Sequence, residues 1–499
     1  MSQLPKGWVS TKFTDYLDVN GGSQPPKKDF LFEETDGYIR LLQIRDFGKK
    51  PLPTYVPFTS KLRLCCEEDI LIGRYGASLG RICTGMEGCY NVALAKVAIP
   101  DLMDNRFVKY YLESELFQQP LRLLSRSAQN GFNKKDLGEF DFPLAPLPEQ
   151  KRIVEKLDEV LAQVDTIKAR LDGIPELLKR FRQSVLASAV SGKLTEEWRG
   201  KHYITVELSK VSRAYAEGWE SEKQREFSLK EKYPKTDSWK QRLPEPYLPT
   251  DEDGVVVGPL PQSWLLVSVD QLTKFVKDGP HYSPKYSDDG IEFISGRNIT
   301  IGGIDFSTSK YITKELHEEL SLRCKPVYND VLLTKGGTTG ISCVNKYKHE
   351  FNVWVHVAVL RVTSEEVILP DYLSMFFNSP VGHFQSQKYT HGVANRDLGL
   401  KRMIKICLGL PSIEEQKEIV RLVDQYFAFA DTIEAQVKKA QARVDNLTQS
   451  ILAKAFRGEL VPQNDDDEPA EVLLERIALA RNEAEALAKA AKKAGKKKA

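Results

Sequence analysis

A long heptad pattern of apolar residues occurs twice in this chain, and it constrains the fold more than any other feature of the sequence. In the first copy the apolar positions recur at alternating steps of four and three: Ile153, Leu157, Val160, Val164, Ile167, Leu171, Ile174, Leu178, Phe181 and Val185. The second copy lies 266 residues further on (419 minus 153): Ile419, Val423, Tyr426, Ala430, Ile433, Val437, Ala440, Val444, Leu447 and Ile451. A mean step of about 3.5 residues keeps one apolar stripe along a helix and is typical of a coiled-coil seam. The two segments are therefore predicted to form long helices that pack on each other.

The residues around the two heptad segments repeat as well. The triplet Glu149-Gln150-Lys151 matches Glu415-Gln416-Lys417 at the same offset of 266. Upstream strings pair at an offset of 261 (330 minus 69): Asp69-Ile70-Leu71 with Asp330-Val331-Leu332, and Asp136-Leu137 with Asp397-Leu398. Leu4-Pro5 and Trp8 also pair with Leu260-Pro261 and Trp264. Repetition over this length predicts a tandem duplication of one unit, a globular domain followed by a long helix.

The predicted organisation has six segments. In chain order they are a first globular domain (1–148), a first long helix (149–194), a connector insertion (195–259), a second globular domain (260–411), a second long helix (412–460) and a charged C-terminal tail (461–499). Short strand-like runs alternate with Gly/Pro turns in the globular parts, and one clear helix follows Asp104, so their class is mixed α/β. The tail, with its acidic start and Lys-rich end, is expected to be a solvated appendage.

The connectivity favours antiparallel packing of the two long helices. Each helix starts at its own domain, and the first must deliver the chain to the second domain. Parallel packing would need a long return, which the connector could in principle supply. The predicted fold is therefore α+β, with two α/β domains separated by two long antiparallel coiled-coil helices in a pseudo-twofold tandem repeat. Gly173 and Pro175 predict a kink near Ile174, because proline removes a helical hydrogen bond.

Composition excludes several classes of protein. The 499 residues are 41% hydrophobic, but no apolar run approaches the roughly 20 residues of a membrane span, so a cytoplasmic protein without a membrane role is expected. The seven cysteines form no C-x-x-C pair and are unmatched across the duplication, which indicates reduced thiols and no metal site. Lys plus Arg number 71 against 69 for Asp plus Glu, so any basic surface must be local.

Two related but diverged domains suit a two-part linear target such as duplex DNA. More specifically, both helices begin with a Pro-x-x-Glu-Gln-Lys-x-Ile-Val type of string, from Pro146 and from Pro411, and end in a Ser-Val/Ile-Leu-Ala string followed by Gly-x-Leu, from Ser184 and Ser450. In the second helix one more residue separates Pro411 from Glu415. A domain, such a helix, and then the whole unit again resembles the specificity subunit of type I restriction-modification systems. The resemblance covers nearly the whole chain except the connector and the tail.

This resemblance implies a non-catalytic subunit whose two target-recognition domains read a split, asymmetric sequence of double-stranded DNA. It implies that the helices space the domains and dock two adenine methyltransferase subunits, which recruit restriction and translocase subunits. No cofactor would bind this chain, and S-adenosylmethionine, ATP and Mg²⁺ would bind the partner subunits. The sequence agrees, since it has neither an Asn/Asp-Pro-Pro-Tyr motif nor a phosphate loop. A bipartite protein-binding scaffold is the alternative; a fused nuclease-methyltransferase is disfavoured because its motifs are missing.

Three pairs of strings supply the candidate DNA contacts. Arginine can pair with guanine and asparagine with adenine, while glycines, hydroxyls and cations suit phosphate. The candidates in the first domain are Arg45, Arg74, Ser78, Lys134 and Lys135, and those in the second are Arg297, Asn298, Lys335, Thr338, Asn395 and Arg396. A solvated strand end, a glycine hairpin and a plain helix start explain the same strings without DNA. His281, Tyr282 and Lys285 weakly suggest readout by the second domain only, and His356 is interpreted as a strand histidine.

The repeated triplets are candidates for a different task. Glutamate in a first helical turn is favoured by the helix dipole, but this does not explain why Gln and Lys recur with it. Glu149, Gln150 and Lys151, with Glu415, Gln416 and Lys417, are therefore predicted to fix the junction between domain and helix or to dock the methyltransferase.

Overall fold

The computed structural model describes residues 4–127, 131–393 and 396–496, and its chain divides into two compact units. Unit 1 comprises Met1–Asp172 with Val437–Ala499, and unit 2 comprises Gly173–Gln436. Each unit therefore contains one globular domain, the start of one long helix and the end of the other. This division agrees with a duplicated unit whose helices are exchanged.

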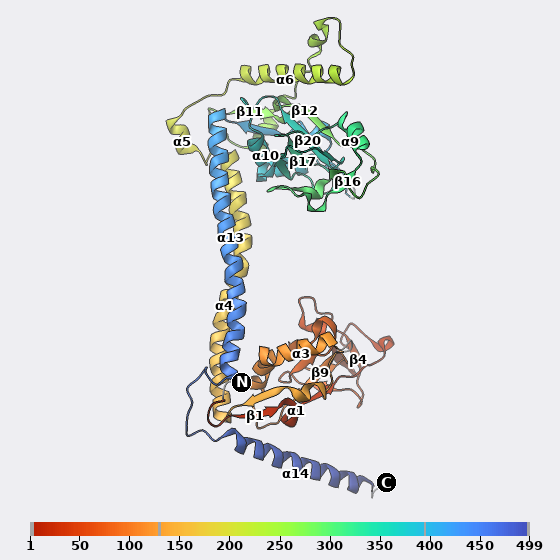
Figure 1. Ribbon diagram of the computed structural model, residues 1–499, viewed down its shortest axis with the longest axis vertical. Coiled ribbons are helices and arrows are strands. Elements are labelled where there is room, and N and C mark those ends of the chain that lie inside the picture. Colours follow the sequence, from red (N-terminus) through yellow and green to blue (C-terminus); the bar gives the residue numbers. More distant parts are fainter. Residues whose placement is uncertain (1–3, 128–130, 394–395, 497–499) are drawn as a thin grey trace. The chain divides into compact units, whose positions relative to one another are not determined.

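The two long helices are α4 (Leu147–Val190) and α13 (Ile413–Phe456), each of 44 residues (Figure 1). In unit 1, Lys168 Nζ lies 2.7 Å from Asp445, and Gln441 donates to Asp172 at 2.7 Å. Residue numbers thus rise along α4 as they fall along α13, so the pairing is antiparallel. α4 continues as a helix through Pro175.

Unit 2 repeats this direction. Arg182 contacts Asp431 at 2.7 Å, and Thr195, just beyond α4, donates to Glu415 at 2.7 Å. The antiparallel prediction is confirmed within each unit.

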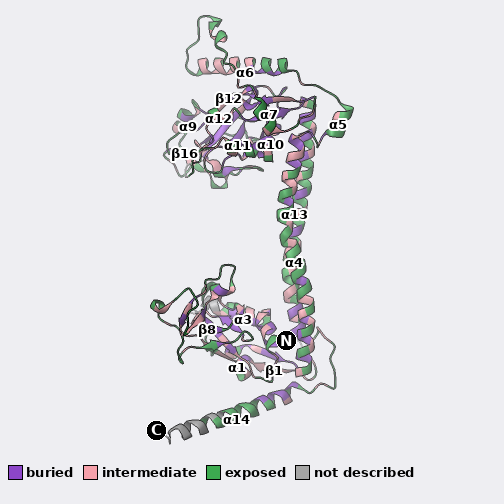
Figure 2. Ribbon diagram, turned by 180° about the vertical axis from the view of Figure 1, so that it is seen from behind, coloured by how far each residue is buried: buried purple, intermediate pink, exposed green. Residues whose placement is uncertain are grey.

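The heptad seam is only partly covered. Ile153 and Leu157 are fully buried, because domain 1 packs on this part of α4. Ile167 remains 46% exposed and Tyr426 40% exposed, although both belong to the predicted stripe. Figure 2 shows buried residues concentrated in the domains, with exposed and intermediate residues along the helices. Two helices alone therefore leave apolar surface open.

Domain 1 contains two four-stranded sheets and a two-stranded ribbon. The antiparallel sheet has the order β2 (Asp18–Gly21), β9 (Leu94–Ala98), β6 (Leu71–Gly73), β7 (Ile82–Cys83). The mixed sheet has the order β4 (Tyr55–Pro57), β3 (Tyr38–Leu42), β8 (Gly88–Tyr90), β5 (Leu64–Cys65), with β3 and β8 parallel. The ribbon pairs β1 (Val9–Lys12) with β10 (Asp141–Leu144), and β10 leads into α4.

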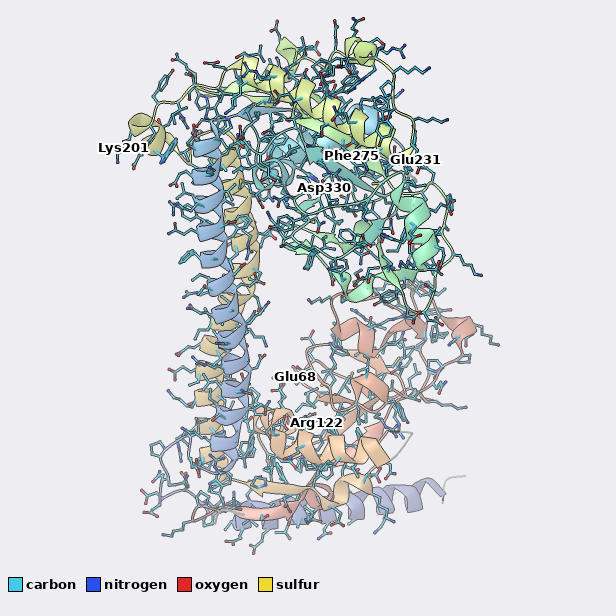
Figure 3. All side chains as sticks on the ribbon, turned by 45° about the horizontal axis from the view of Figure 1, so that its top comes forward. Glu68, Arg122, Lys201, Glu231, Phe275 and Asp330 are labelled. Atoms are coloured by element: carbon cyan, nitrogen blue, oxygen red, sulfur yellow. The ribbon has the colours of Figure 1, made fainter. Side chains whose placement is uncertain are left out.

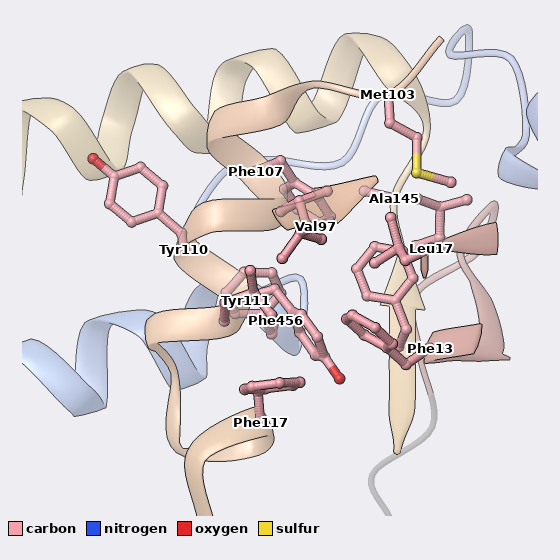
Figure 4. Packing of buried hydrophobic residues seen from close by; sticks show 14 of the residues in the cluster. Phe13, Leu17, Val97, Met103, Phe107, Tyr110, Tyr111, Phe117, Ala145 and Phe456 are labelled. Carbon is pink, nitrogen blue, oxygen red and sulfur yellow. The ribbon is translucent and has the colours of Figure 1, made fainter. Parts of the chain in front are cut away.

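The described part of domain 1 also contains the α-helices α1 (Phe13–Tyr16), α2 (Asn105–Glu113) and α3 (Glu115–Ser127). α2 is the helix predicted after Asp104, whose carboxylate caps it by accepting from the backbone N–H groups of Arg106 and Phe107. The end of α13 enters the core of this domain, where the ring of Phe456 lies 5.2 Å from that of Phe107 and 5.8 Å from that of Tyr111 (Figure 4). Burying each such ring stabilises unit 1 by roughly 1.5–3 kcal/mol.

Domain 2 repeats the plan. Its antiparallel sheet has the order β12 (Thr273–Asp278), β20 (Val357–Val362), β17 (Val331–Thr334), β18 (Ser342–Val344). Its mixed sheet has the order β16 (Lys310–Ile312), β13 (Ile291–Ile294), β19 (Phe351–Val353), with β13 and β19 parallel. Its ribbons pair β11 (Leu265–Ser268) with β21 (Cys407–Leu410) and β14 (Ile299–Thr300) with β15 (Gly303–Ile304). Its helices are α8 (Val269–Leu272), α9 (Lys314–Ser321), α10 (Pro370–Asn378), α11 (Pro380–Lys388) and α12 (Leu400–Met403). The predicted tandem duplication of mixed domains is confirmed.

The connector folds onto domain 2 as α5 (Glu196–Lys201), α6 (Leu208–Leu229) and α7 (Asp251–Val257). α6 covers β12 so closely that a Cβ on Gly218 would lie 3.1 Å from Cβ of Lys274. Arg225 of α6 lies over the ring of Phe275, at 5.3 Å from its centroid. Arg361 stacks on the same ring and binds buried Asp330; Phe275 and Asp330 are labelled in Figure 3.

The C-terminal tail forms α14 (Ala470–Lys496). The expectation of a solvated appendage is wrong for its first turns, because Leu473 is 3% exposed and Ile477 is 5% exposed against the core of domain 1. Ala470, Leu473, Leu474 and Ile477 share one face at helical spacing, which is the signal that the charge of the tail obscured.

The seven cysteines are free thiols, and all except Cys66 are buried. Burial raises the pKa of the Cys83 thiol to about 11. Within the described residues, no helix is both long and apolar enough to cross a bilayer, and no group of three potential metal ligands is found.

Candidate nucleic-acid interface

Three loops that are distant in sequence meet on one surface of domain 1. They are the arginine turn after β3 (43–48), the glycine loop after β6 (73–80) and the third loop (131–137). Gly73 lies so close to the arginine turn that a Cβ there would be 3.3 Å from Ile44 Cδ1. A Cβ on Gly131 would overlap the carbonyl oxygen of Arg74 and lie 2.5 Å from the ring of Tyr75. Glycine is therefore required where these loops cross.

The corresponding loops meet in domain 2: the arginine turn (295–298), the glycine loop (335–340) and the third loop (396–398). The backbone N–H of Gly337 donates to the Arg396 carbonyl at 3.1 Å, and that of Leu398 donates to the Lys335 carbonyl at 2.7 Å. A Cβ on Gly296 would lie 3.7 Å from the Gly336 carbonyl oxygen. Both domains therefore bring the same three strings together, as a shared interface requires.

The two arginine turns share the same backbone conformation and the same closing hydrogen bond. Each is a 3₁₀ turn, Ile44–Phe47 in domain 1 and Gly296–Asn298 in domain 2. A buried side chain closes each turn: Asp46 accepts the Gln43 backbone N–H at 2.7 Å, and Asn298 accepts that of Ser295 at 2.9 Å. This arrangement leaves the preceding residue, Arg45 or Arg297, exposed.

The candidates in the arginine turns differ in availability. Asn298 is 1% exposed, and its amide also donates to the Asp305 carbonyl and to Thr308, so it is not free to pair with adenine. Arg45 donates to Thr54 at 3.0 Å. Across the described ranges, Arg297 has no hydrogen bond or ion pair from its side chain. Arg45 and Arg297 remain the candidates for base contact.

The two glycine loops also differ. The Arg74 guanidinium is half-buried, donates weakly to the Phe132 carbonyl at 3.4 Å and lies over the Tyr75 ring. Its counterpart Lys335 is 4% exposed and pairs with Asp397 at 2.7 Å and with Asp278 at 3.5 Å. Lys335 is therefore a neutralised internal cation and not a surface one.

The hydroxyl candidates of the glycine loops are split in the same way. Ser78 donates to the Tyr75 carbonyl at 2.8 Å, which ties it to its own loop. Thr338 is exposed. Thr338 is therefore the freer of the two.

The third loops contribute exposed cations. Lys134 pairs with Asp18 at 2.6 Å, whereas no partner of the exposed Lys135 ammonium is found in the part of the chain that the structure describes. Arg396 is exposed and donates to Gln387. Asn395 lies outside the described residues.

The repeated Glu residues lie at the junction between domain and helix. Glu149 is 1% exposed and accepts hydrogen bonds from Trp8 Nε1 at 2.9 Å and from Gln463 at 2.7 Å. Burial raises the pKa of this carboxyl group. In unit 2, Glu415 accepts from Trp264 Nε1 at 2.9 Å, from Thr195 and from Arg199 at 3.0 Å.

The repeated Gln residues complete the junction. Gln150 accepts the Asp104 backbone N–H at 3.1 Å and donates to the Ala145 carbonyl at 2.8 Å. Gln416 accepts the Leu369 N–H and donates to the carbonyls of Val367 and Pro411. Lys151 and Lys417 are exposed. The Glu and Gln side chains thus hold the junction, and only the lysines remain available to a partner.

Sequence reasoning missed several contacts of these sites. The matched tryptophans Trp8 and Trp264 were visible as a repeat, but their bonds to glutamate were not. His356 lies in a turn between β19 and β20, so the prediction of a strand histidine is wrong. Burial and the nearby Lys335 lower the pKa of its imidazole. His281 contacts the Asp278 carboxylate at 3.3 Å, and the Tyr282 carbonyl accepts from Trp354 Nε1.

Comparison with known proteins agrees with this geometry. The family model described as type I restriction modification DNA specificity domain matches twice, over residues 5–176 and 271–441. The type I restriction enzyme EcoBI specificity subunit of Escherichia coli is 33% identical over 504 residues, covering 98% of this chain and 95% of that protein. The EcoKI specificity subunit of Escherichia coli strain K12 is 28% identical, covering 99% of each chain.

A solved structure shares the fold. A chain from a structure of complex assembly and conformational transition of the type I R-M system superimposes with a TM-score of 0.56 at 15% identity. The superposition covers 92% of this chain and all of the other.

Proposed function

The chain belongs to the family of type I restriction modification DNA specificity domains, and from this premise we propose that each globular domain reads one half of a split, asymmetric DNA site. Its relatives are specificity subunits, which are non-catalytic components of type I restriction enzymes. The observation that carries the proposal is the convergence of the same three loops in both domains, with different side chains exposed in each.

Within this proposal some of the exposed cations contact bases and others contact phosphates. Arg45 and Arg297 project from rigid turns and contact base edges, because guanidinium can bond guanine at two points. Lys135, Lys134 and Arg396 contact phosphates, which fixes the register of the domain on the duplex without reading sequence. Lys335 only shapes its loop, since its charge is already paired.

We further propose that α4 and α13 set the spacing of the half-sites and dock two adenine methyltransferase subunits. Apolar side chains along the helices support docking: Ile167 and Leu447 are each 46% exposed in unit 1, and Leu177 and Phe429 are 60% and 59% exposed in unit 2. Exposed apolar surface of this kind marks protein contacts. Restriction subunits join through the assembled complex in the cytoplasm, and S-adenosylmethionine, ATP and Mg²⁺ bind the partner subunits.

Selection of DNA sites by the full chain tests the reading function. Randomised duplexes are enriched on the full chain with its methyltransferase subunits, and dissociation constants of winners and scrambled sequences are compared at fixed salt. We expect two unlike conserved blocks separated by a fixed spacer, bound at least about 10³-fold more tightly than scrambled DNA. Equal affinity for all sequences contradicts the proposal and favours a protein-binding scaffold.

Paired deletions test the spacing. Residues 165–171 of α4 lie opposite 442–448 of α13, since Lys168 pairs with Asp445. Removing both heptads keeps the register and shortens the helix pair by about 10 Å, or roughly three base pairs. The preferred spacer should shorten by that amount while both half-sites stay unchanged. Deleting 442–448 alone is the control, because it breaks the register; an unchanged spacer after the paired deletion refutes the ruler.

A further inference from the structure

Domain 2 has a cleft at the carboxyl ends of its two parallel strands, β13 and β19. Its volume is about 690 Å³, and it opens beside the glycine loop and the arginine turn. The Trp354 backbone N–H donates to the Ile294 carbonyl at 2.9 Å, which holds the two strand ends together. Crevices at the carboxyl ends of parallel strands are common ligand sites.

The chemistry of the cleft is cationic and aromatic. Arg297 and Lys310 both line it, and no acidic side chain is among the described residues that line it. Lys310 Nζ lies 4.0 Å from the centroid of the Tyr286 ring, which fixes the ammonium near one wall. Trp354 forms another wall, and its indole is held by the bond from Nε1 to the Tyr282 carbonyl at 3.2 Å. Two cations beside flat rings suit a ligand that has both a phosphate and a base.

Two further groups can contact the edge of a base. Thr338 contributes an exposed hydroxyl from the glycine loop. The lowered pKa of His356 keeps its imidazole neutral near pH 7, so it offers one donor and one acceptor.

The same positions in domain 1 carry different residues. The backbone bond from Arg74 to Ala93 has the same place and length, 2.9 Å, as the bond from Lys335 to His356. By the same reasoning Asn91, whose N–H binds the Leu42 carbonyl, corresponds to Trp354. The strand registers place Thr54 where domain 2 has Lys310. In domain 1 this threonine binds Arg45, whereas in domain 2 Arg297 is left for the cleft.

We propose that this cleft binds one nucleotide of the target DNA, turned out of the duplex, with the face of its base against Trp354, the edge of its base beside Arg297 and its phosphate at Lys310. The proposal rests on the proposed function, because two of the three loops assigned to DNA, the arginine turn and the glycine loop, line the cleft. Extrusion requires unpairing that costs a few kcal/mol, and the cations and the ring compensate for it. Domain 1 has Thr54, Asn91 and Ala93 at the equivalent positions, so extrusion is specific to the half-site of domain 2.

A mismatch scan tests the proposal on the full chain without methyltransferase. A mispair is placed at each position of both selected half-sites, and dissociation constants are measured by fluorescence anisotropy. At one position of the domain 2 half-site, a mispair should tighten binding at least about fivefold, because the duplex already holds that base weakly. 2-Aminopurine at the same position should change its emission on binding.

The variants place residues of domain 1 at the equivalent positions of domain 2. Lys310→Thr with Trp354→Asn should abolish the mismatch effect and the 2-aminopurine change, and Lys310→Thr alone should lower the salt slope by about one. Lys310→Arg keeps the charge and should retain the mismatch effect and the 2-aminopurine change. This variant separates loss of the ammonium charge from loss of folding. Lys314→Thr, on the exposed first residue of α9, is the matched control and should behave as the parent.

Three outcomes overturn the proposal in different ways. Sequence-specific binding with no mismatch effect in the domain 2 half-site refutes extrusion and leaves the proposed function intact. Binding of all duplexes with equal affinity, without preference in either half-site, refutes both extrusion and the proposed function. Saturable binding of free AMP or ATP at micromolar concentration, lost in Lys310→Thr, assigns the cleft to a free nucleotide instead of DNA.

Discussion

The two domains agree where they join the helices and differ in the three loops that we propose contact DNA. Trp8 binds Glu149 and Trp264 binds Glu415 at the same distance, 2.9 Å. In these loops, by contrast, Arg45 is anchored to Thr54, whereas its counterpart Arg297 has no side-chain partner among the described residues. Similarly, a half-buried Arg74 corresponds to a buried Lys335. The duplicated unit therefore retained the bonds at its junctions, while the side chains of the three loops changed.

The junctions between domain and helix differ in one respect, and this difference gives the largest expected effect on stability. Glu415 binds a cation, Arg199, whereas the side-chain donors to Glu149 are the neutral Trp8 and Gln463. Glu415→Ala leaves a nearly buried guanidinium unpaired, so the free energy of unfolding of unit 2 should fall by about 3–5 kcal/mol. Glu149→Ala should cost about 1–3 kcal/mol in unit 1.

Urea titration followed by tryptophan fluorescence measures both losses. Glu414→Ala, at an exposed neighbouring position, is the control and should be nearly neutral. Equal losses for Glu149→Ala and Glu415→Ala would remove the distinction between the two junctions.

The arginine turns provide the next largest effect, measured on DNA binding. Arg45→Ala and Arg297→Ala should each weaken specific binding by about 1–3 kcal/mol. Each should relax sequence preference in one half-site only, because the two domains read separately. Binding to duplexes mutated in one half-site or the other checks this. Lys135→Ala should weaken all duplexes alike, and relaxation of both half-sites by a single arginine change would contradict separate reading.

The helix ends test whether the two junctions are equally strict. Gly192 has φ +75° beside Pro261, and Gly458 has φ +70° beside Pro5. Alanine at either position should lower the free energy of unfolding by about 1–2 kcal/mol, because residues with a side chain disfavour the left-handed backbone region. Gly173→Ala, inside α4 with nothing within 4 Å, should instead stabilise by about 0.5–1 kcal/mol. Thermal unfolding of the three variants measures these changes in stability. If only one of Gly192→Ala and Gly458→Ala were destabilising, the two junctions would not be equally strict.

The smallest effect concerns pH. Burial raises the pKa of Glu149 above its usual value near 4.5. Between the usual and the raised pKa the folded chain binds more protons than the unfolded chain, so the free energy of unfolding falls as pH rises through that window. Glu149→Gln should remove this part of the slope, whereas Glu414→Gln should not. Stability curves from pH 4 to 7 decide; an unchanged slope in Glu149→Gln would show that its pKa is ordinary.

The periodic features of this protein were readable in the sequence. Heptad spacing is a local property of the helix, so Ile153 to Val185 and Ile419 to Ile451 predict α4 and α13, and the fixed offset predicts the duplication. The same spacing did not predict exposure: Ile167 and Leu447 satisfy the stripe but remain open, because burial depends on what packs opposite. Apolar spacing in the tail, from Ala470 to Ile477, was readable and was obscured by the charges around it.

The chemistry of single residues was decided by the tertiary structure. Lys335 and Asn298 look like surface readers in the sequence, yet one is paired inside the domain and the other is saturated by hydrogen bonds. Thr54, Lys310 and Trp354 carried no local signal, because their roles come from sheet order and register. Sequence alone determined that two related mixed domains and two long helices exist, since local periodicity and repetition require no knowledge of contacts. Only the folded chain decided which cations stay free, because burial and partners arise from segments far apart in sequence.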